Sequence, residues 1–160
     1  MEDTLSPPQT ESGAGFESTR VRQFIVFLAN RVGRLQQLVR ALEEADIRIV
    51  AISIEESSET SLIRLICSDG DLGREILNRE KFSFAESDLL LVEVPRNTTQ
   101  PLVAICSALL SAEIGIHYAY PLLHRPKGPA LAMYVDEPTL AAEILIRKGF
   151  TLLGESDLKA

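Results

Sequence analysis

The chain has 160 residues, and 46% of them are hydrophobic, which is enough for the core of one ordinary domain or of two small ones. Its formal net charge of -7 at pH 7 argues against a protein that binds nucleic acids or anionic membranes. No apolar run is long enough to span a bilayer, and the N-terminus lacks the basic start and apolar core of a secretory signal, so we expect a cytoplasmic protein.

Residues 1–20 contain few aliphatic side chains and many prolines, serines and glycines, which predicts a disordered tail. Residues 22–29 include five consecutive large apolar side chains, a pattern typical of a strand that is covered on both faces. A polar turn follows at residues 30–33. Asn30 is expected to cap the next helix, and Gly33 allows the backbone to turn tightly.

Residues 34 to about 45 have the apolar spacing of an amphipathic helix, carried by Leu35, Leu38, Val39, Leu42 and Ala45. Residues 47–54 and 62–67 then predict two strands of a hairpin, joined by an acidic turn. Asp69 opens a second helix, and a short fourth strand is expected at residues 82–87. Cys67 and Cys106 both lie in apolar segments, so we expect buried thiols rather than a disulfide or a metal site.

The same order of elements returns when the sequence is shifted by 67 residues, which places Asn97 on Asn30. The second copy predicts strands at residues 89–94, 114–122, 130–135 and 150–153. Its first helix holds Pro101 in its opening turn, and its second is expected to be capped by Asp136 and to end at Gly149. Whether the last strand of the first copy runs directly into the second copy is open.

Each copy therefore reads β-α-β-β-α-β, which predicts an α+β fold of two ferredoxin-like βαββαβ units. Each unit has an antiparallel sheet with its helices on one face. The expected units are residues 21–88 and 89–160. Because the strands are apolar on both sides, we expect the sheets to pair edge to edge or face to face, between the copies and between chains in a homo-oligomer such as a dimer.

The turns at residues 30–33 and 97–100 are the candidate ligand sites, because each precedes a helix N-terminus whose free N–H groups attract a carboxylate or phosphate. We expect each turn to lie beside the start of the following strand, where Arg48 and Ile49 or Gly115 and Ile116 occur. A small zwitterion would fit between them. The alternative is that Asn and Gly only cap and turn the chain.

The segment Phe-Leu-Ala-Asn30-Arg31-Val32-Gly33-Arg34-Leu35 resembles the opening of an ACT domain, which typically has Asn-Arg/Lys-Pro-Gly-x-Leu there. The resemblance covers both copies and implies the βαββαβ fold, amino-acid binding between paired domains, and regulation of amino-acid metabolism by a stand-alone tandem ACT protein. Val32 stands where the family usually has Pro, and Arg48 where it often has a ligand-contacting Asn. In the second copy Gln100 replaces the turn glycine.

The segment His117-Tyr118-Ala119-Tyr120 also resembles tandem members of this family, and its two tyrosines share one face of the strand. They would line a pocket or, alternatively, cover apolar surface. The candidate ligand-binding residues are Asn30, Arg31, Val32, Gly33, Arg34, Leu35, Arg48, Ile49, Asn97, Thr98, Thr99, Gln100, Tyr118 and Tyr120.

Catalysis is not expected, because no nucleophile, acid–base pair or glycine-rich phosphate loop has a suitable spacing. His117 and His124 have no cysteine partners at metal-ligand spacing, and no cofactor is implied. Two functions remain. The chain is a non-catalytic sensor of a small molecule, most simply an amino acid, or a regulatory subunit of a metabolic enzyme such as acetolactate synthase, with the ligand optional.

Overall fold

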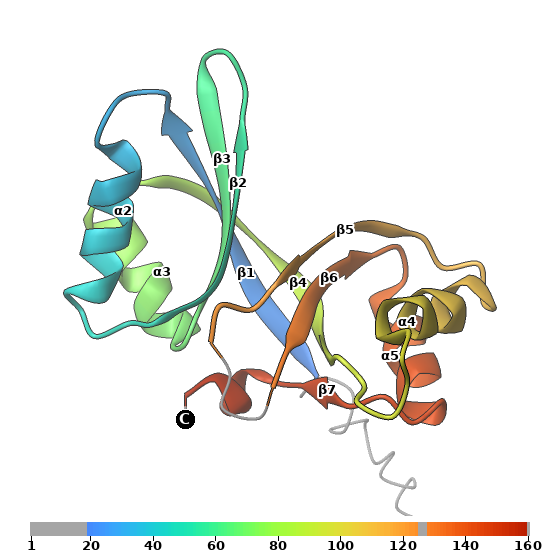
Figure 1. Ribbon diagram of the computed structural model, residues 1–160. Coiled ribbons are helices and arrows are strands. Elements are labelled where there is room, and N and C mark those ends of the chain that lie inside the picture. The colour runs from blue at the N-terminus through green and yellow to red at the C-terminus, as the bar shows by residue number, and fades with distance from the viewer. Residues whose placement is uncertain (1–18, 125–127, 160) are drawn as a thin grey trace, which may run out of the picture.

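The computed structural model describes residues 19–124 and 128–159 (Figure 1). Most of the tail expected at residues 1–20 lies outside this part of the chain. The first half contains the elements β1 (Arg20–Ala29), α2 (Arg34–Glu43), β2 (Ile49–Glu56), β3 (Thr60–Cys67), α3 (Gly70–Arg79) and β4 (Ser83–Glu93). The second half contains α4 (Pro101–Leu110), β5 (Ile116–Pro121), β6 (Ala130–Val135), α5 (Pro138–Arg147), β7 (Leu152–Leu153) and the short 3-10 helix η1 (Glu155–Leu158).

The two halves repeat each other in backbone detail. Asp46 and Glu113, which are 67 residues apart, each close a helix with a φ of 58°. The residue after each donates its N–H to a carbonyl of that helix, at Leu42 and Leu109, both at 3.1 Å. The strands that follow, β2 and β5, have an irregular register at equivalent positions. These matches confirm two βαββαβ units.

All the strands join in one seven-stranded sheet of order β2-β3-β1-β4-β6-β5, with β7 also paired to β4. The sheets of the two units are therefore joined edge to edge, which is one of the two pairings that the apolar strands predicted. The reason is β4, which pairs β1 through residues 83–90 and β6 through residues 90–93. No glycine or proline interrupts it. The expected boundary at residues 88 and 89 falls inside this shared strand.

The sheet curls until its two outer strands meet (Figure 1). Ala51 of β2 forms a bridge with Leu122, and the N–H of Leu123 donates to the carbonyl of Val50 at 2.7 Å. The helix-free faces of the two units therefore pack against each other, as the apolar pattern predicted. We call the buried side chains between them the inner cluster: Val21, Val50, Ala51, Ile66, Leu89, Leu91, Tyr120, Ala130, Ala132, Leu153 and Leu158.

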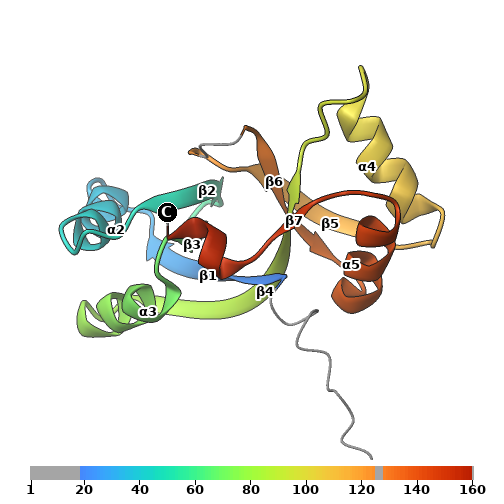
Figure 2. The same cartoon turned by 90° about the horizontal axis from the view of Figure 1, so that it is seen from below.

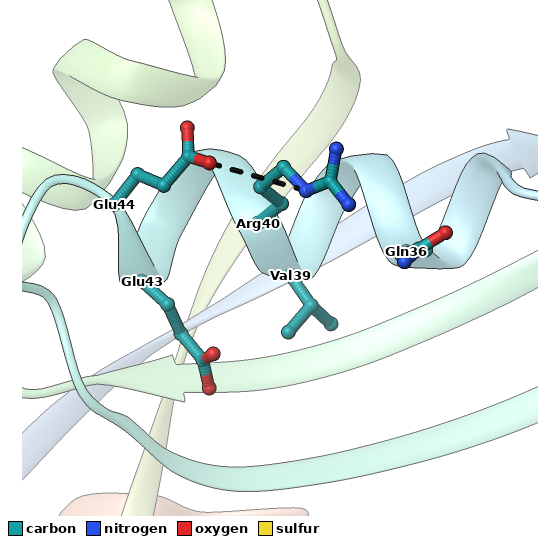
Figure 3. A pocket seen from close by; sticks show the side chains of 5 residues that line it. All are labelled: Gln36, Val39, Arg40, Glu43 and Glu44. Atoms are coloured by element: carbon teal, nitrogen blue, oxygen red, sulfur yellow. Dashed lines mark ion pairs between the residues drawn. The ribbon is translucent and has the colours of Figure 1, made fainter.

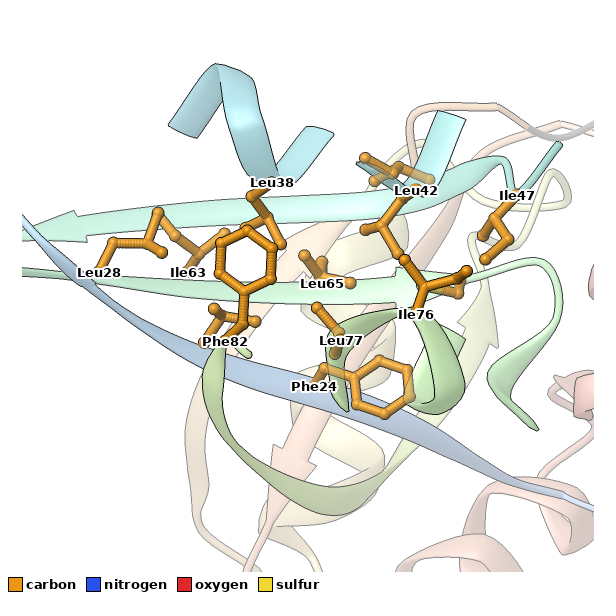
Figure 4. Close-up of a cluster of buried hydrophobic side chains, with 13 residues drawn as sticks. Phe24, Leu28, Leu38, Leu42, Ile47, Ile63, Leu65, Ile76, Leu77 and Phe82 are labelled. Atoms are coloured by element: carbon orange, nitrogen blue, oxygen red, sulfur yellow. The ribbon is translucent and has the colours of Figure 1, made fainter. Parts of the chain in front are cut away.

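The helices lie outside this curl, with α2 and α3 on one unit and α4 and α5 on the other (Figures 1 and 2). Each pair covers its own core. Most of the labelled side chains of the first core come from both helices and from β1 and β3, and include Phe24, Leu38, Leu65 and Ile76 (Figure 4). The second core is built likewise around Ile105, Leu109 and Leu145. The molecule thus has three apolar layers, of which the central one joins the units.

Several local expectations need correction. Asn30 does not cap α2, because Gly33 with a φ of 89° occupies the N-cap position, and the Asn30 side chain donates to the carbonyl of Ser57. Asp136 does not cap α5, because its carboxylate accepts the N–H of Gly115 at 2.9 Å.

Cys106 is exposed on α4, so the expectation that its thiol is buried is wrong. The helix α2 ends at Glu43 rather than near Ala45 because Asp46 turns the chain out of the helix.

Candidate functional site

A pocket of about 210 Å³ lies against the first turn. Its walls come from the end of β1, the start of α2, the end of β2 and the start of β3. Its lining residues are Leu28, Ala29, Asn30, Arg31, Arg34, Leu35, Ile54, Glu56, Ser61 and Ile63. Pockets for drug-sized ligands range from about 300 to 1,000 Å³, so this one suits a smaller molecule. We call it the turn pocket.

The turn pocket has an apolar floor and a charged rim. Leu28 and Ile63 are buried, with 2% and 1% of their surface exposed. Arg31 and Glu56 are exposed and carry opposite charges. Within the described part of the chain, neither Arg31 nor Glu56 forms an ion pair shorter than 4 Å. A guanidinium and a carboxylate at one mouth can hold a molecule that carries both charges.

The positive end of α2 also contributes to the turn pocket. No side chain caps Gly33, and no acidic residue lies in the first turn of the helix. Arg34 and Leu35, the first residues of the helix, line the pocket. Uncapped N–H groups at a helix start favour an anionic group such as a carboxylate. Arg34 itself is engaged, because it donates to Gln37 at 2.8 Å and lies 5.2 Å from the centre of the Phe82 ring.

Arg48 and Ile49 are not beside the first turn, so the expected adjacency is wrong. Ile49 pairs with Cys67, whereas the end of β1 pairs with the start of β3, where Ala29 lies opposite Thr60. The turn is therefore near the end of β2 rather than its start. A ligand role for Arg48 and Ile49 stays a prediction.

The sequence pattern did not single out Ile54, Glu56 and Ser61, which line the pocket instead. In a βαββαβ unit β1 and β2 run parallel on either side of β3. Their C-terminal ends therefore lie at the same end of the sheet. Applying that rule to the hairpin would have found Ile54 and Glu56. Of the residues predicted in the first turn, Asn30, Arg31, Arg34 and Leu35 line the pocket, whereas Val32 is fully exposed to solvent.

The second turn is built differently. The side chains of Asn97, Thr98, Thr99 and Gln100 are exposed, and the N–H of Gln100 is bonded locally to the Thr98 hydroxyl at 3.1 Å. Pro101 starts α4 and removes one N–H from the helix start. A ligand role for these residues stays a prediction.

Tyr118 and Tyr120 lie between the two units. The Tyr120 hydroxyl donates to the side-chain oxygen of Gln23 at 2.8 Å, and the Gln23 amide donates to the hydroxyls of Tyr118 and Ser87. Burial raises the pKa of Tyr120 above its usual range, with a further rise from Tyr118, so this hydroxyl stays neutral and donates. The sequence did not mark Gln23, whose polar side chain is completely buried on β1.

Tyr118 also stacks on Tyr134 with their ring centroids 5.1 Å apart, and the Arg64 guanidinium lies 4.1 Å from the centre of the Tyr118 ring. These contacts hold β5 against β1 and β3. In this structure the two predicted tyrosines therefore join the units, and a part in ligand binding stays a prediction.

A second hollow, of about 390 Å³, lies along α2 (Figure 3). All of its lining side chains come from this one helix and its C-cap residue: Gln36, Val39, Arg40, Glu43 and Glu44. The ion pair that Figure 3 draws, Arg40 to Glu44 at 3.9 Å, joins two largely exposed side chains. A one-helix surface of this kind supplies no convergent polar groups, so it is a weaker candidate than the turn pocket.

Among residues 19–124 and 128–159, no three His, Cys, Asp or Glu side chains are grouped so that they could hold a metal ion. In that same part of the chain, no helix combines the length and the apolar character that crossing a membrane requires.

A family model described as an ACT domain pair matches residues 19–160. A search of the curated proteins found no significant match. The crystal structure of protein BT0572 from Bacteroides thetaiotaomicron is similar, with 25% sequence identity and a TM-score of 0.79, over 88% of this chain and 96% of that one. The ligand-free regulatory subunit of aspartate kinase from Thermus thermophilus shares the fold at 12% identity and a TM-score of 0.54, over 81% of this chain and 89% of that one.

Proposed function

Because this chain belongs to the ACT domain pair family, we propose that it is a non-catalytic regulatory protein that binds an amino acid in the turn pocket. The observation that carries the proposal is the opposite charge of Arg31 and Glu56 on the rim of a small pocket at the start of α2. An α-amino acid presents a carboxylate and an ammonium group a few ångströms apart, which matches this rim.

Binding would act on the protein by linking α2 to the hairpin that β2 and β3 form. The turn pocket touches α2, β2 and β3, so a bound amino acid bridges the helix start and the far end of the hairpin. A ligand shifts an equilibrium only by its difference in affinity for the two states. An arrangement in which α2 and the hairpin are held together is the one that the ligand would favour.

The test is thermal unfolding of the purified protein with each of the twenty amino acids at millimolar concentration. A ligand at about 100 times its dissociation constant adds roughly 2.7 kcal/mol of stability, which raises the Tm by several degrees. Asn30→Ala should abolish the shift, because Asn30 lines the pocket, whereas the matched variant Asn97→Ala should keep it. A panel in which no amino acid changes the Tm would show that amino-acid sensing is the wrong function.

We further propose that two copies pair through α4. This helix has no charged residue, and Leu102, Val103 and Leu110 on its outer side are 54%, 57% and 74% exposed. The equivalent positions of α2 in the first unit are Leu35, Gln36 and Glu43, so two of the three apolar side chains are replaced by polar ones there. Contiguous exposed apolar surface of this kind indicates a protein interface.

Sedimentation velocity at micromolar concentration tests the pairing. The unmodified chain should sediment as a dimer and Val103→Glu as a monomer, whereas Gln36→Glu on α2 should leave the dimer intact. An unmodified chain that sediments as a strict monomer would contradict self-pairing. It would favour the alternative in which this face attaches the protein to an amino-acid biosynthetic enzyme as its regulatory subunit.

A further inference from the structure

We propose that each chain has a single amino-acid site, in its first half only, and that this site accepts amino acids with an uncharged aliphatic side chain. The proposal rests on the proposed function and adds the number of sites, the side chain that binds the ammonium group, and the class of ligand. Two observations support it: the two units differ at equivalent positions, and the turn pocket has an apolar lining.

The backbone fixes which residues of the two units correspond. The helix ends at Asp46 and Glu113 and the irregular registers that begin at Ile49 and Ile116 are all 67 residues apart. The same spacing relates the start of α2 to that of α4 and β2 to β5, so Pro101 is at the position of Arg34 and Leu123 at that of Glu56. The strands before the two turns are 66 residues apart, since Phe24 corresponds to Leu90, so the position of Arg31 is taken by Asn97 or Thr98.

At these positions the second unit therefore lacks each charge that lines the turn pocket. Asn97 and Thr98 are neutral, and Pro101 and Leu123 are apolar. The segment that follows β5 also forms a different contact, because the N–H of Leu123 donates to the carbonyl of Val50 in β2. That bond closes the sheet. The end of β2, by contrast, stays in a hairpin beside the first turn, where Glu56 reaches the pocket.

Within the turn pocket, each part of an aliphatic amino acid has a counterpart. Glu56 is the one acidic side chain of the lining and would accept hydrogen bonds from the ammonium group. Arg31 and the start of α2 would bind the carboxylate. Arg34 is less available, because it is bonded to Gln37 and lies over the Phe82 ring.

The side chain of the ligand would meet the apolar lining, which combines the buried floor of Leu28 and Ile63 with the exposed side chains of Leu35 and Ile54. A branched aliphatic side chain buries its carbons there at little cost. A charged side chain pressed against the same carbons would lose its hydration without gaining a partner. The pocket thus discriminates against lysine and aspartate and favours an amino acid such as valine.

Isothermal titration of the full chain with valine, lysine and aspartate tests the number of sites and the ligand class. We expect one valine per chain and binding of lysine and aspartate at least about tenfold weaker. The role of Glu56 in binding the ammonium group is tested with 3-methylbutanoate, which is valine without its amino group. Because hydrogen bonds to charged groups contribute about 1.5–3 kcal/mol, Glu56→Gln should weaken valine binding about tenfold or more and leave 3-methylbutanoate binding unchanged.

Two matched controls separate this site from its surroundings. Glu59→Gln removes an exposed acidic side chain of the same hairpin that does not line the pocket, and it should bind valine normally. Leu123→Glu should leave both the affinity and the single site unchanged. Two valines per chain, unchanged valine binding by Glu56→Gln, or a preference for aspartate or lysine would overturn the inference while leaving amino-acid sensing in place. If no amino acid binds at all, the proposed function fails as well.

Discussion

At the scale of single residues, three non-glycine residues within 19–124 and 128–159 hold a backbone conformation that favours glycine. Asp46, Lys81 and Glu113 each have a φ of 58°, and each follows the end of a helix. The equivalent position after α5 is Gly149, with a φ of 89°. The left-handed conformation costs a residue with a Cβ atom about 1 kcal/mol relative to glycine. The chain thus uses glycine at one of these four helix ends and accepts strain at the other three.

Asp46→Gly should therefore stabilise the protein, by about 0.5–1 kcal/mol, even though glycine gains entropy in the unfolded chain. The free energy of unfolding from urea denaturation measures the change. Ala41→Gly, within the same helix, is the matched control and should destabilise by about 0.5–1 kcal/mol or more, because that position is right-handed. A lower stability of Asp46→Gly would mean that the Asp46 side chain makes a contribution larger than the backbone strain.

Residue by residue, the sequence predicted the turn pocket only in part. Asn30, Arg31, Arg34 and Leu35 were recognisable because they follow an apolar strand and begin a helix. Glu56 was not, because it is 26 positions beyond Asn30 in the sequence and reaches the pocket only through the pairing of β3 with both β1 and β2. Gln23 was missed for a similar reason, since its partners Tyr118 and Tyr120 belong to the other unit.

At the scale of elements, apolar periodicity predicted the order of helices and strands in both halves. What it left open is whether the strands predicted at residues 82–87 and 89–94 are one strand, which they are, because the run from Ser83 to Glu93 contains no residue that stops a strand. It also did not predict η1, whose four residues are too few to show a period. This short element returns from the second unit to β1. Its Glu155 carboxylate accepts the backbone N–H of Arg22 at 3.1 Å and forms an ion pair with the Arg22 guanidinium.

The element η1 should add measurably to stability through Leu158, which is 7% exposed and belongs to the inner cluster. Replacing a buried leucine by alanine typically costs about 2–5 kcal/mol, and the terminal position of Leu158 places it at the low end. Urea unfolding of Leu158→Ala should show this loss. Leu123→Ala removes a leucine that is 64% exposed and should change the stability by less than about 0.5 kcal/mol. Equal effects of the two variants would show that η1 does not pack on the sheet in solution.

At the scale of the whole molecule, the two units share more than a linker. They share the strand β4, the inner cluster, and the closing contact between β2 and β5. A unit that separated from its neighbour would expose the apolar helix-free face of its sheet to water. The sequence repeat therefore corresponds to two structural units. In the folded molecule these units share one continuous sheet, and neither is independent of the other.

One cooperative unfolding transition should follow from this sharing. In scanning calorimetry of the ligand-free chain, the calorimetric and van't Hoff enthalpies should be equal, as they are for a single two-state unit. Tyr120→Ala, which removes a buried ring between the units, should lower the Tm of that one transition without splitting it, because β4 still joins the halves. Val39→Ala, which trims a partly buried side chain of the first core, is the control and should lower the Tm less. Two resolved transitions in the unmodified chain would show that each βαββαβ unit folds independently. In that case the inner cluster would be a docking contact between two domains rather than part of a common core.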